Sequence, residues 1–334
     1  MTANSKLRLL YIRDILSEHS DEEHPLNSTD IISLLESKYG ISCERKTVYD
    51  CIDALTDYGY DIIKAGTKKG FFMASREFEL PEIRVLIDAV QSADFISPKK
   101  SKALLEKLGK YASKYQFSKI EKQVYIENRN KRNNESLFYT INELHDAIIS
   151  KKQVDIIYRK RRISDDIKPH YEEKKLRINP YCLIWSDDHY YLVGNHEKYD
   201  NLIHLRIDRI KSVEQTDLRA RHFSEVSPYK VSFDAADYSN KHLSMFSGDI
   251  KPVELICKNE IIEEILDEFG EKTKIFPYDS KSFTARLNLA VTPGLVSKIM
   301  QYGDSIIVRT PNELKNMIIN KSKSILEIYD SEKR

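Results

Sequence analysis

The apolar residues of the first 75 positions recur three or four apart, which predicts three successive helices. Asn27 or Ser28 can cap the second helix, which stops at Gly40. Ser42 can cap the third helix, expected over residues 43–58. Two short apolar runs then flank a basic turn, which predicts a β-hairpin. The strands of this hairpin are expected at residues 61–65 and 71–74.

Helical spacing returns from residue 78 to about residue 117, with a break where Ser97 precedes Pro98. Residues 128–134 are polar and lack apolar anchors, so we expect a linker there. A further helix with apolar positions over residues 137–148 follows.

The pattern then changes to short strands separated by polar turns, which is typical of a small barrel. These strands are expected at residues 154–158, 175–181, 189–194 and 202–210. Residues 221–247 show no regular period. The last part has the order strand, helix, strand, strand, helix, strand, helix, which fits a ferredoxin-like α/β sandwich. Its strands are expected at residues 253–258, 273–278, 282–290 and 305–309, and its helices at 260–269, 293–302 and 311–329.

Composition excludes several classes of protein. A chain of 334 residues with 41% hydrophobic and 10% aromatic residues can build two or three folded cores, which excludes a wholly disordered chain. No apolar run approaches the roughly 20 residues that a membrane span needs. The four cysteines are scattered without a CxxC pair, which argues against a disulfide scaffold and against structural zinc. We therefore expect a reduced, cytoplasmic protein without a membrane partner.

Enzyme and cofactor motifs are missing from the sequence. His189, His196 and His204 follow no metal-binding spacing, so no metal site is expected. The chain contains no Gly-rich phosphate loop, GxSxG or HExxH, so we expect neither a catalytic residue nor a cofactor.

Charge is balanced overall and uneven along the chain. The net charge is +1, but residues 98–133 carry an excess of eight positive charges, and residues 260–271 carry six carboxylates without a cation. Either run can be a solvated helix face, so global charge alone does not indicate a nucleic-acid partner.

The third predicted helix has two faces of different chemistry. Val48, Ile52 and Leu55 lie on one face, which would pack on the first two helices. Arg45 and Lys46 lie away from that face, where they can neutralise phosphates or reach guanine edges in a major groove. The alternative is a helical hairpin that contacts another protein.

The stretch 42–55, with Tyr58-Gly59-Tyr60-Asp61-Ile62 after it, resembles the winged helix-turn-helix of bacterial regulators. Relatives usually read Thr-Val/Ile-Tyr-Arg-Asp-Ile, and here Asp50 stands in place of the Arg and Cys51 in place of the Asp. Positive and negative residues balance over positions 42–70, so we expect two copies to bind DNA together. The expected DNA-binding residues are Ser42, Arg45, Lys46, Thr47, Tyr49, Lys64, Lys68 and Lys69.

The stretches 179–185, 190–193 and 204–210 resemble the WYL domain of bacterial regulators, an Sm-like β-barrel. The family tripeptide Trp-Tyr-Leu is present as Tyr190-Tyr191-Leu192, with an aromatic exchange at its first position. The resemblance extends over nearly the whole chain and implies a multidomain α+β protein. Its expected parts are a winged helix-turn-helix (1–75), a helical linker (76–135), the Sm-like WYL barrel (136–232) and a ferredoxin-like C-terminal extension called WCX (245–330).

The resemblance also implies a basic site in the barrel for a nucleotide or a short single-stranded nucleic acid. Alternation along residues 202–210 places His204, Arg206 and Asp208 opposite the apolar positions, and two arginines beside tyrosines can hold phosphate. The alternative is that Asp208 pairs locally with Arg206 or Arg209, and that Tyr190 and Trp185 belong to the barrel core. The expected effector-binding residues are Tyr158, Tyr181, Tyr191, His204, Arg206 and Arg209.

Together these features predict a homodimeric, non-enzymatic transcription regulator that binds double-stranded DNA and senses a phosphate-bearing effector. The alternative is an accessory factor that binds RNA or single strands and regulates no promoter. A third possibility is an enzyme with a DNA-targeting domain.

Overall fold

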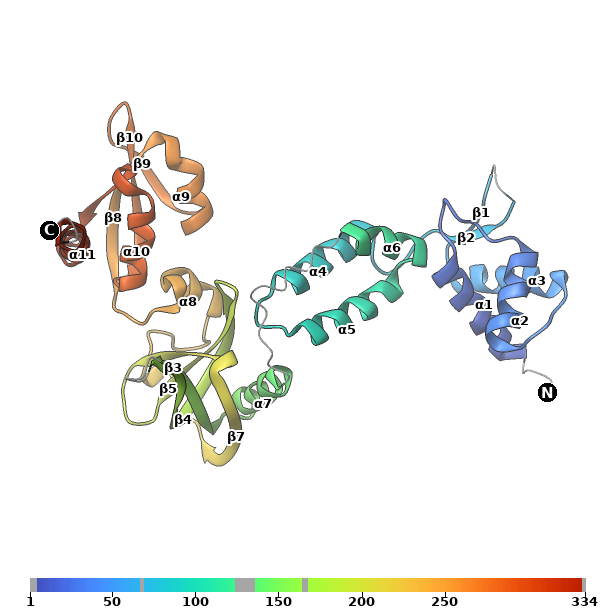
Figure 1. The fold of residues 1–334 in the computed structure, drawn as a ribbon, viewed down its shortest axis with the longest axis horizontal. Helices are drawn as coiled ribbons and strands as arrows, with labels where there is room; N and C mark the ends of the chain where they lie inside the picture. The colour runs from blue at the N-terminus through green and yellow to red at the C-terminus, as the bar shows by residue number, and fades with distance from the viewer. Residues whose placement is uncertain (1–4, 67–68, 124–135, 164–167, 332–334) are drawn as a thin grey trace. The chain divides into compact units, whose positions relative to one another are not determined.

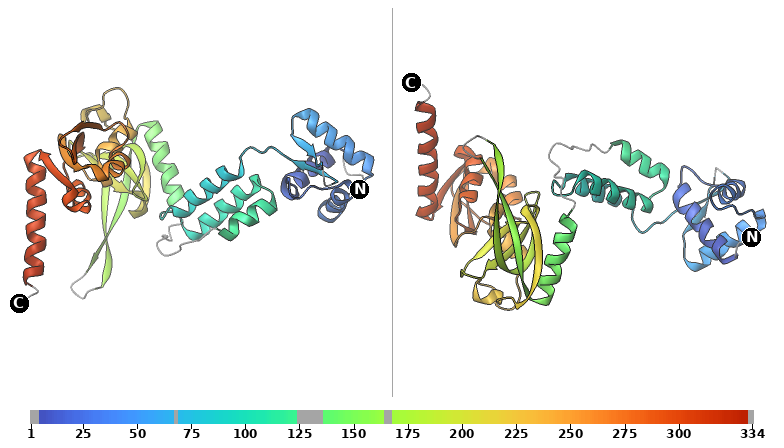
Figure 2. Two further views of the ribbon diagram at one scale, coloured as in Figure 1. Left: turned by 90° about the horizontal axis from the view of Figure 1, so that it is seen from above. Right: turned by 60° about the horizontal axis from the view of Figure 1, so that its bottom comes forward.

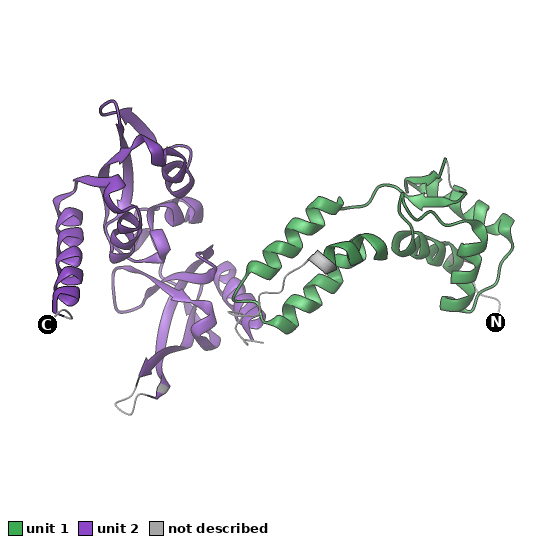
Figure 3. Ribbon diagram, turned by 45° about the horizontal axis from the view of Figure 1, so that its top comes forward, with its two compact units in different colours: residues 1–135 green, residues 136–334 purple. Residues whose placement is uncertain are grey.

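The computed structural model describes residues 5–66, 69–123, 136–163 and 168–331. The chain is a mixed α+β protein whose contacts divide it into two compact units, residues 1–135 and 136–334 (Figure 3). The linker expected at residues 128–134 lies outside the described residues.

The first 75 residues of unit 1 form three helices and a small hairpin around one core (Figure 1). Ile12, Ile31 and Ile52, one from each helix, are almost completely buried together. Burial of such a side chain contributes about 1.5–3 kcal/mol. These elements are α1 (Ser5–His19), α2 (Ser28–Tyr39), α3 (Arg45–Tyr58), β1 (Ile62–Lys64) and β2 (Phe71–Met73).

The helix ends follow local side-chain chemistry. Asn27 caps α2 in a reciprocal capping box with Asp30, and Gly40 ends that helix in the left-handed conformation, as the sequence predicts. The predicted first residue of α3 was wrong. That helix begins at Arg45 after Glu44, which makes no side-chain cap, so Ser42 is not its cap.

A helical region completes unit 1. Ser97 caps α5 and Pro98 opens it, so the predicted break is confirmed. Arg76 joins this region to α1 by donating hydrogen bonds to the carbonyl oxygens of Ser17 and Ser20, at 2.7 and 2.8 Å. The helices are α4 (Leu80–Ser92), α5 (Pro98–Leu108) and α6 (Lys114–Gln123), with a short 3-10 turn η1 (Gly109–Tyr111) before α6.

Unit 2 begins with a helix and an antiparallel five-stranded sheet of order β6-β5-β4-β3-β7. Figure 2 shows β3 and β4 extending well beyond the other strands as a long hairpin. The elements are α7 (Leu137–Ser150), β3 (Lys152–Ile163), β4 (Pro169–Ser186), β5 (His189–His196), β6 (Leu202–Arg206) and β7 (Ile210–Arg219).

Two expectations for this sheet were wrong. The strand expected at 202–210 ends at Arg206, because residues Ile207–Arg209 form a 3-10 turn, η2. The sequence analysis also missed β7, which pairs with β3. In β7 the exposed and partly buried residues do not alternate cleanly, so the period-2 signal is weak.

The C-terminal part of unit 2 contains an antiparallel four-stranded sheet of order β11-β8-β10-β9. The predicted order of strands and helices is confirmed. Helices α9 and α10 bury Ile265, Leu295 and Ile299 against one face of the sheet. The elements are β8 (Ile250–Lys258), α9 (Ile262–Phe269), β9 (Lys274–Pro277), β10 (Ser282–Ala290), α10 (Pro293–Gln301), β11 (Ile306–Thr310) and α11 (Asn312–Ser331).

The segment between the two sheets is more ordered than its sequence indicates. It contains the seven-residue helix α8 (Ala235–Lys241), which Asp234 caps, and the 3-10 turns η3 (Phe223–Glu225) and η4 (Leu243–Met245). Among the described residues, no helix combines the length and apolar character needed to cross a bilayer.

Candidate functional site

The first candidate site is the exposed side of α3 with the neighbouring hairpin. Val48, Ile52 and Leu55 are buried, whereas Arg45, Lys46 and Tyr49 are exposed on the opposite side of the helix. No carboxylate of the described residues lies within 4.0 Å of Arg45 or Lys46. Lys46 is therefore available to an external anion, and Arg45, which donates one hydrogen bond to Thr29 Oγ1 at 3.3 Å, keeps further N–H donors for one.

The hairpin is fixed to the helices by its second strand. Phe71 exchanges two backbone hydrogen bonds with Leu26, at 2.8 and 2.9 Å, and its ring meets the Tyr49 ring edge-on with the centroids 5.7 Å apart. Lys64 and Lys69 are exposed, and Lys68 lies outside the described residues. The exposed Ser42 precedes α3, and Thr47 is half-buried.

The second candidate site lies in the five-stranded sheet around Arg206. The Arg206 guanidinium donates two hydrogen bonds to the Asp208 carboxylate, at 3.0 and 3.1 Å, and the two side chains are only 14% and 4% exposed. The local pairing that the sequence left open as an alternative is therefore present. Arg206 does not extend freely into solvent.

Tyrosines surround this ion pair. The Tyr158 hydroxyl accepts a hydrogen bond from the backbone nitrogen of Arg206 at 3.3 Å, and Tyr191 pairs with Arg206 in the β5–β6 register. Burial raises the pKa of Tyr191, which the nearby Arg206 and Arg209 partly offset. The exposed Arg209 has no carboxylate of the described residues within 4.0 Å.

Two of the predicted effector-binding residues belong to a different cluster, which also includes Tyr191. His204 Nε2 lies 2.8 Å from the Tyr238 hydroxyl, and its Nδ1 lies 3.1 Å from Ser247 Oγ. Burial lowers the pKa of His204 to about 4, so this imidazole is neutral near pH 7. Tyr181 packs against Phe223 and Phe233 with its hydroxyl buried, and burial raises its pKa.

The six predicted residues therefore fall into two groups that share Tyr191. Tyr158, Tyr191, Arg206 and Arg209 come together, whereas Tyr181 and His204 pack beside α8. Trp185 is 48% exposed, so the alternative that placed it in the barrel core does not hold. Within the described part of the chain, no group of three His, Cys, Asp or Glu side chains is placed to hold a metal ion.

The family model of the WYL domain matches residues 139–215. The chain contains a WYL domain. The matched range begins inside α7 and ends within β7, so the WYL domain comprises α7 and the five-stranded sheet.

The chain was also compared with solved structures, one of which is similar to it. Proteasome accessory factor B/C (PafBC) of Arthrobacter aurescens is similar at 15% sequence identity, with a TM-score of 0.29. The match covers 98% of this chain and 49% of PafBC, so this chain spans about half the length of that structure. None of the curated proteins matches the chain.

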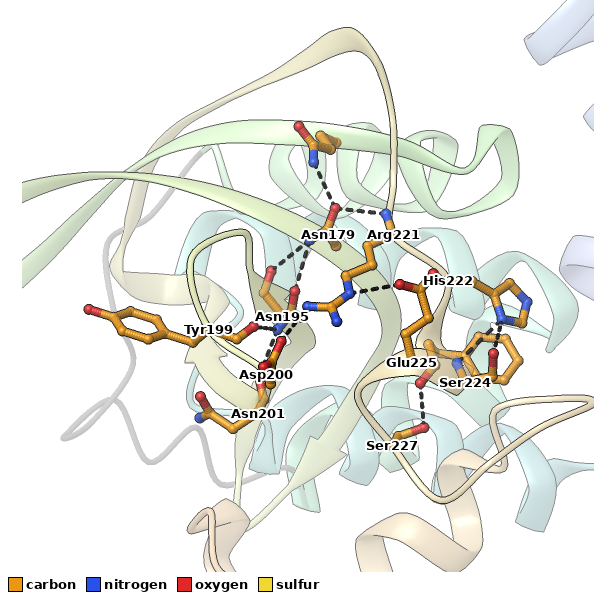
Figure 4. A network of polar contacts seen from close by, with 12 residues as sticks. Asn179, Asn195, Tyr199, Asp200, Asn201, Arg221, His222, Ser224, Glu225 and Ser227 are labelled. Atoms are coloured by element: carbon orange, nitrogen blue, oxygen red, sulfur yellow. Dashed lines mark hydrogen bonds and ion pairs between the residues drawn. The ribbon is translucent and has the colours of Figure 1, made fainter.

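A buried amide network in the WYL domain was not predicted from the sequence (Figure 4). Asn179 and Asn195 are almost fully buried, and Asn179 Nδ2 donates a hydrogen bond to Asn195 Oδ1 at 2.9 Å. Asn195 Nδ2 in turn donates to the carbonyl oxygens of Tyr199 and Asn201, at 2.6 and 3.0 Å. The pair therefore fixes the loop between β5 and β6.

The same network extends to the segment that follows β7. The backbone nitrogen of Arg221 donates to Asn179 Oδ1 at 2.9 Å, and the Arg221 guanidinium pairs with Asp200 and Glu225 at 2.7 and 3.0 Å. Asn179 stands directly before Pro180 in the stretch that carries the family resemblance. That position is the one sequence feature that could have marked Asn179 as a structural residue. Nothing in the local sequence distinguishes Asn195 from an exposed asparagine.

Proposed function

We propose that this chain is a DNA-binding transcription regulator, with the exposed side of α3 as the surface that enters the major groove. The observation that carries this proposal is the placement of Arg45 and Lys46 opposite the buried face of α3, exposed and with no carboxylate of the described residues within 4.0 Å. The β1–β2 hairpin adds Lys64 and Lys69 beside the helix bundle, as a wing requires for adjacent phosphates. Ser42, Thr47, Tyr49 and Lys68 complete the proposed set.

The same proposal divides the chain into four parts. Residues 1–75 serve as a winged helix-turn-helix, 76–135 as a helical linker, 136–232 as an Sm-like WYL barrel and 245–330 as a ferredoxin-like WCX extension. The strand order β11-β8-β10-β9, with both helices on one face, supports the last assignment. We assign no catalytic role and no cofactor, and we place the protein in the cytoplasm.

We propose that the WYL domain senses a phosphate-bearing effector, a nucleotide or a short single strand. The proximity of both Arg206 and Arg209 to Tyr191 supports this part of the proposal. Arg209 can bind phosphate without giving up a carboxylate of the described residues, whereas Arg206 would first have to exchange Asp208 for the ligand.

We also propose a homodimer that forms through α11. The second half of this helix exposes Ile325, Leu326, Ile328 and Tyr329. These side chains are neighbours and form one apolar patch, unlike the single exposed apolar residues that are common on protein surfaces. Lysines precede this surface at positions 315, 321 and 323, and carboxylates lie at positions 327 and 330. An antiparallel pairing with a second copy across this surface would bring Lys321 and Lys323 of each helix toward Glu327 and Asp330 of the other.

A competition experiment tests the function as a regulator. Genomic footprinting of the tagged protein identifies bound duplexes, and the affinity for one such duplex is then compared with that for bulk DNA at fixed salt. We expect a preference of roughly 10³-fold or more for a pseudo-palindromic site. Equal binding to all duplexes, with tighter binding to RNA or single strands, would instead indicate the accessory factor.

A further inference from the structure

The turn between α1 and α2, residues 20–26, contacts both the β1–β2 hairpin and the linker helix α6. Strand β2 is attached to this turn at both of its ends. At one end the backbone nitrogen of Met73 donates a hydrogen bond to Ser20 Oγ at 3.1 Å. At the other end Leu26 exchanges two backbone hydrogen bonds with Phe71. The place of the turn therefore determines the place of β2. We call this segment the α1–α2 turn.

The linker helix α6 holds the middle of the α1–α2 turn. Ser113, directly before α6, donates a hydrogen bond from its Oγ to Asp21 Oδ2 at 2.5 Å. Asp21 is only 5% exposed and Ser113 is completely buried. The His24 ring also stacks on the Tyr115 ring, with the centroids 3.8 Å apart. The turn is thus held by the hairpin at its ends and by the linker between them.

Asp21 is a buried carboxylate that hydrogen bonds keep ionised. Its Oδ1 accepts hydrogen bonds from the backbone nitrogens of Glu23 and His24, at 3.1 and 2.9 Å, and lies 2.7 Å from His24 Nδ1. Burial raises the pKa of Asp21, but the hydrogen bonds from Ser113 and His24 outweigh this effect and lower it below its usual value. Loss of the Ser113 hydroxyl would leave a buried, charged oxygen without that donor, so the turn would have to shift.

The same hydroxyl also begins the linker helix. Ser113 Oγ accepts a hydrogen bond from the backbone nitrogen of Gln116 at 3.1 Å, and the backbone nitrogen of Ser113 donates to Gln116 Oε1 at 3.2 Å. This reciprocal arrangement is a capping box. Because one hydroxyl both caps α6 and donates to Asp21, a movement at the start of α6 reaches the α1–α2 turn directly.

Hydrogen bonds at the turn, rather than a shared apolar core, connect the linker to the first 75 residues. Among the described residues, the core of the three N-terminal helices and the core of the linker helices have no member in common. A hollow of about 570 Å³, lined by Met73 of β2 and Phe78 before α4, lies between the hairpin and the linker. Arg76 adds a further link at the same turn by donating to the carbonyl oxygen of Ser20.

We propose that Asp21 and Ser113 are positioning residues that couple the helical linker to the β1–β2 hairpin. Through the α1–α2 turn, the start of α6 then determines where Lys64 and Lys69 meet DNA. This inference rests on the DNA-binding part of the proposed function. It adds a route by which the linker alters DNA binding through the hairpin, while the contacts of α3 stay as they are.

A double-mutant cycle on the full chain tests the coupling, with affinity for a footprinted duplex at fixed salt as the measurement. We expect Lys64→Ala/Lys69→Ala to weaken binding at least about fivefold in the wild type and less than about twofold in Ser113→Ala, because the hairpin is then no longer held in place. Arg45→Ala/Lys46→Ala should weaken binding by the same factor in both backgrounds. A general loss of structure would reduce both effects alike.

Two further variants separate the coupling from the helix cap. Gln116→Ala weakens the start of α6 but leaves the hydrogen bond between Ser113 and Asp21, so the two hairpin lysines should contribute as in the wild type. Ser20→Ala removes the hydrogen bond to Met73 at the other end of the turn and should act as Ser113→Ala does. Ser20→Ala also repeats the test if Ser113→Ala fails to fold.

Two results would overturn the coupling. The hairpin lysines could contribute equally in the wild type and in Ser113→Ala, or Gln116→Ala could reduce their contribution as much as Ser113→Ala does. Either result leaves the regulator function intact. If the wild type binds no duplex, the proposed function fails, and hydrogen–deuterium exchange of residues 69–74 decides the coupling alone. Exchange there should be at least about fivefold faster in Ser113→Ala than in Gln116→Ala, and equal exchange would contradict it.

Discussion

Burial determines which side chains of the WYL domain can bind a ligand without first breaking an existing ion pair. Arg206 and Asp208 form a largely buried ion pair, and removing one member of such a pair leaves an uncompensated charge. Arg209 lies three residues further along and is exposed. We therefore expect Arg209 to respond to phosphate directly, and Arg206 to keep the η2 turn in place through Asp208 and Tyr158.

His204 predicts a pH dependence of stability in the WYL domain. Burial lowers its pKa to about 4, whereas an unfolded histidine titrates near 6.5. As the pH falls from 6.5 to 4, the unfolded chain takes up a proton that the folded chain refuses, so stability decreases across this window. This coupling of proton uptake to unfolding predicts that His204 lowers the free energy of unfolding by about 3 kcal/mol across the window.

Urea unfolding followed through the single tryptophan, Trp185, measures this loss within the WYL domain. The comparison is between the wild type and His204→Gln from pH 7 to pH 4. The variant should lose stability less steeply, although the neighbouring His242, whose pKa burial also lowers, leaves a residual slope. Identical slopes in the two proteins would show that His204 does not stay neutral in the folded state.

At the scale of elements, the sequence predicts helices and strands best where the apolar pattern repeats over many residues and a capping residue, glycine or proline marks the end. Helix α2 with its Asn27 cap, the Ser97–Pro98 break and the strand and helix order of the C-terminal part all follow from local signals. The strand expected through residue 210 failed because η2 interrupts it after Arg206. The division of the predicted effector residues into two groups depends on long-range packing beside α8, which local sequence does not encode.

The β1–β2 hairpin depends on one glycine directly before β2. Gly70 has φ of 153°, and an added Cβ would lie 2.7 Å from the backbone of Leu26. Gly70→Ala should therefore destabilise the hairpin by roughly 1–3 kcal/mol. Gly66→Ala is the matched control, because its Cβ would meet nothing within 4 Å.

Hydrogen–deuterium exchange of peptides spanning residues 24–29 and 69–74 measures this local opening. Exchange in Gly70→Ala should be at least about fivefold faster than in the wild type, and Gly66→Ala should match the wild type. Equal protection in both variants would mean that the wing does not depend on this close approach.

At the scale of the whole molecule, the exposed half of α11 predicts the oligomeric state. Ile325→Glu/Leu326→Glu places charge on the proposed two-fold interface and should shift the protein from dimer to monomer in multi-angle light scattering. Lys175→Glu/Lys281→Glu serves as a control for added negative charge away from this helix. A monomeric wild type at all concentrations, with and without DNA, would contradict the dimer.

The central claim is that α3 contacts duplex DNA, and the most direct measurement is the affinity of Arg45→Ala/Lys46→Ala for a footprinted duplex at fixed salt. One bidentate base contact contributes roughly 1–3 kcal/mol, so we expect an affinity loss of about 5-fold to 150-fold. Lys175→Ala/Lys281→Ala should bind as the wild type does, and circular dichroism confirms that each variant is folded. Unchanged affinity in the folded Arg45→Ala/Lys46→Ala protein would remove α3 from the interface and contradict the account.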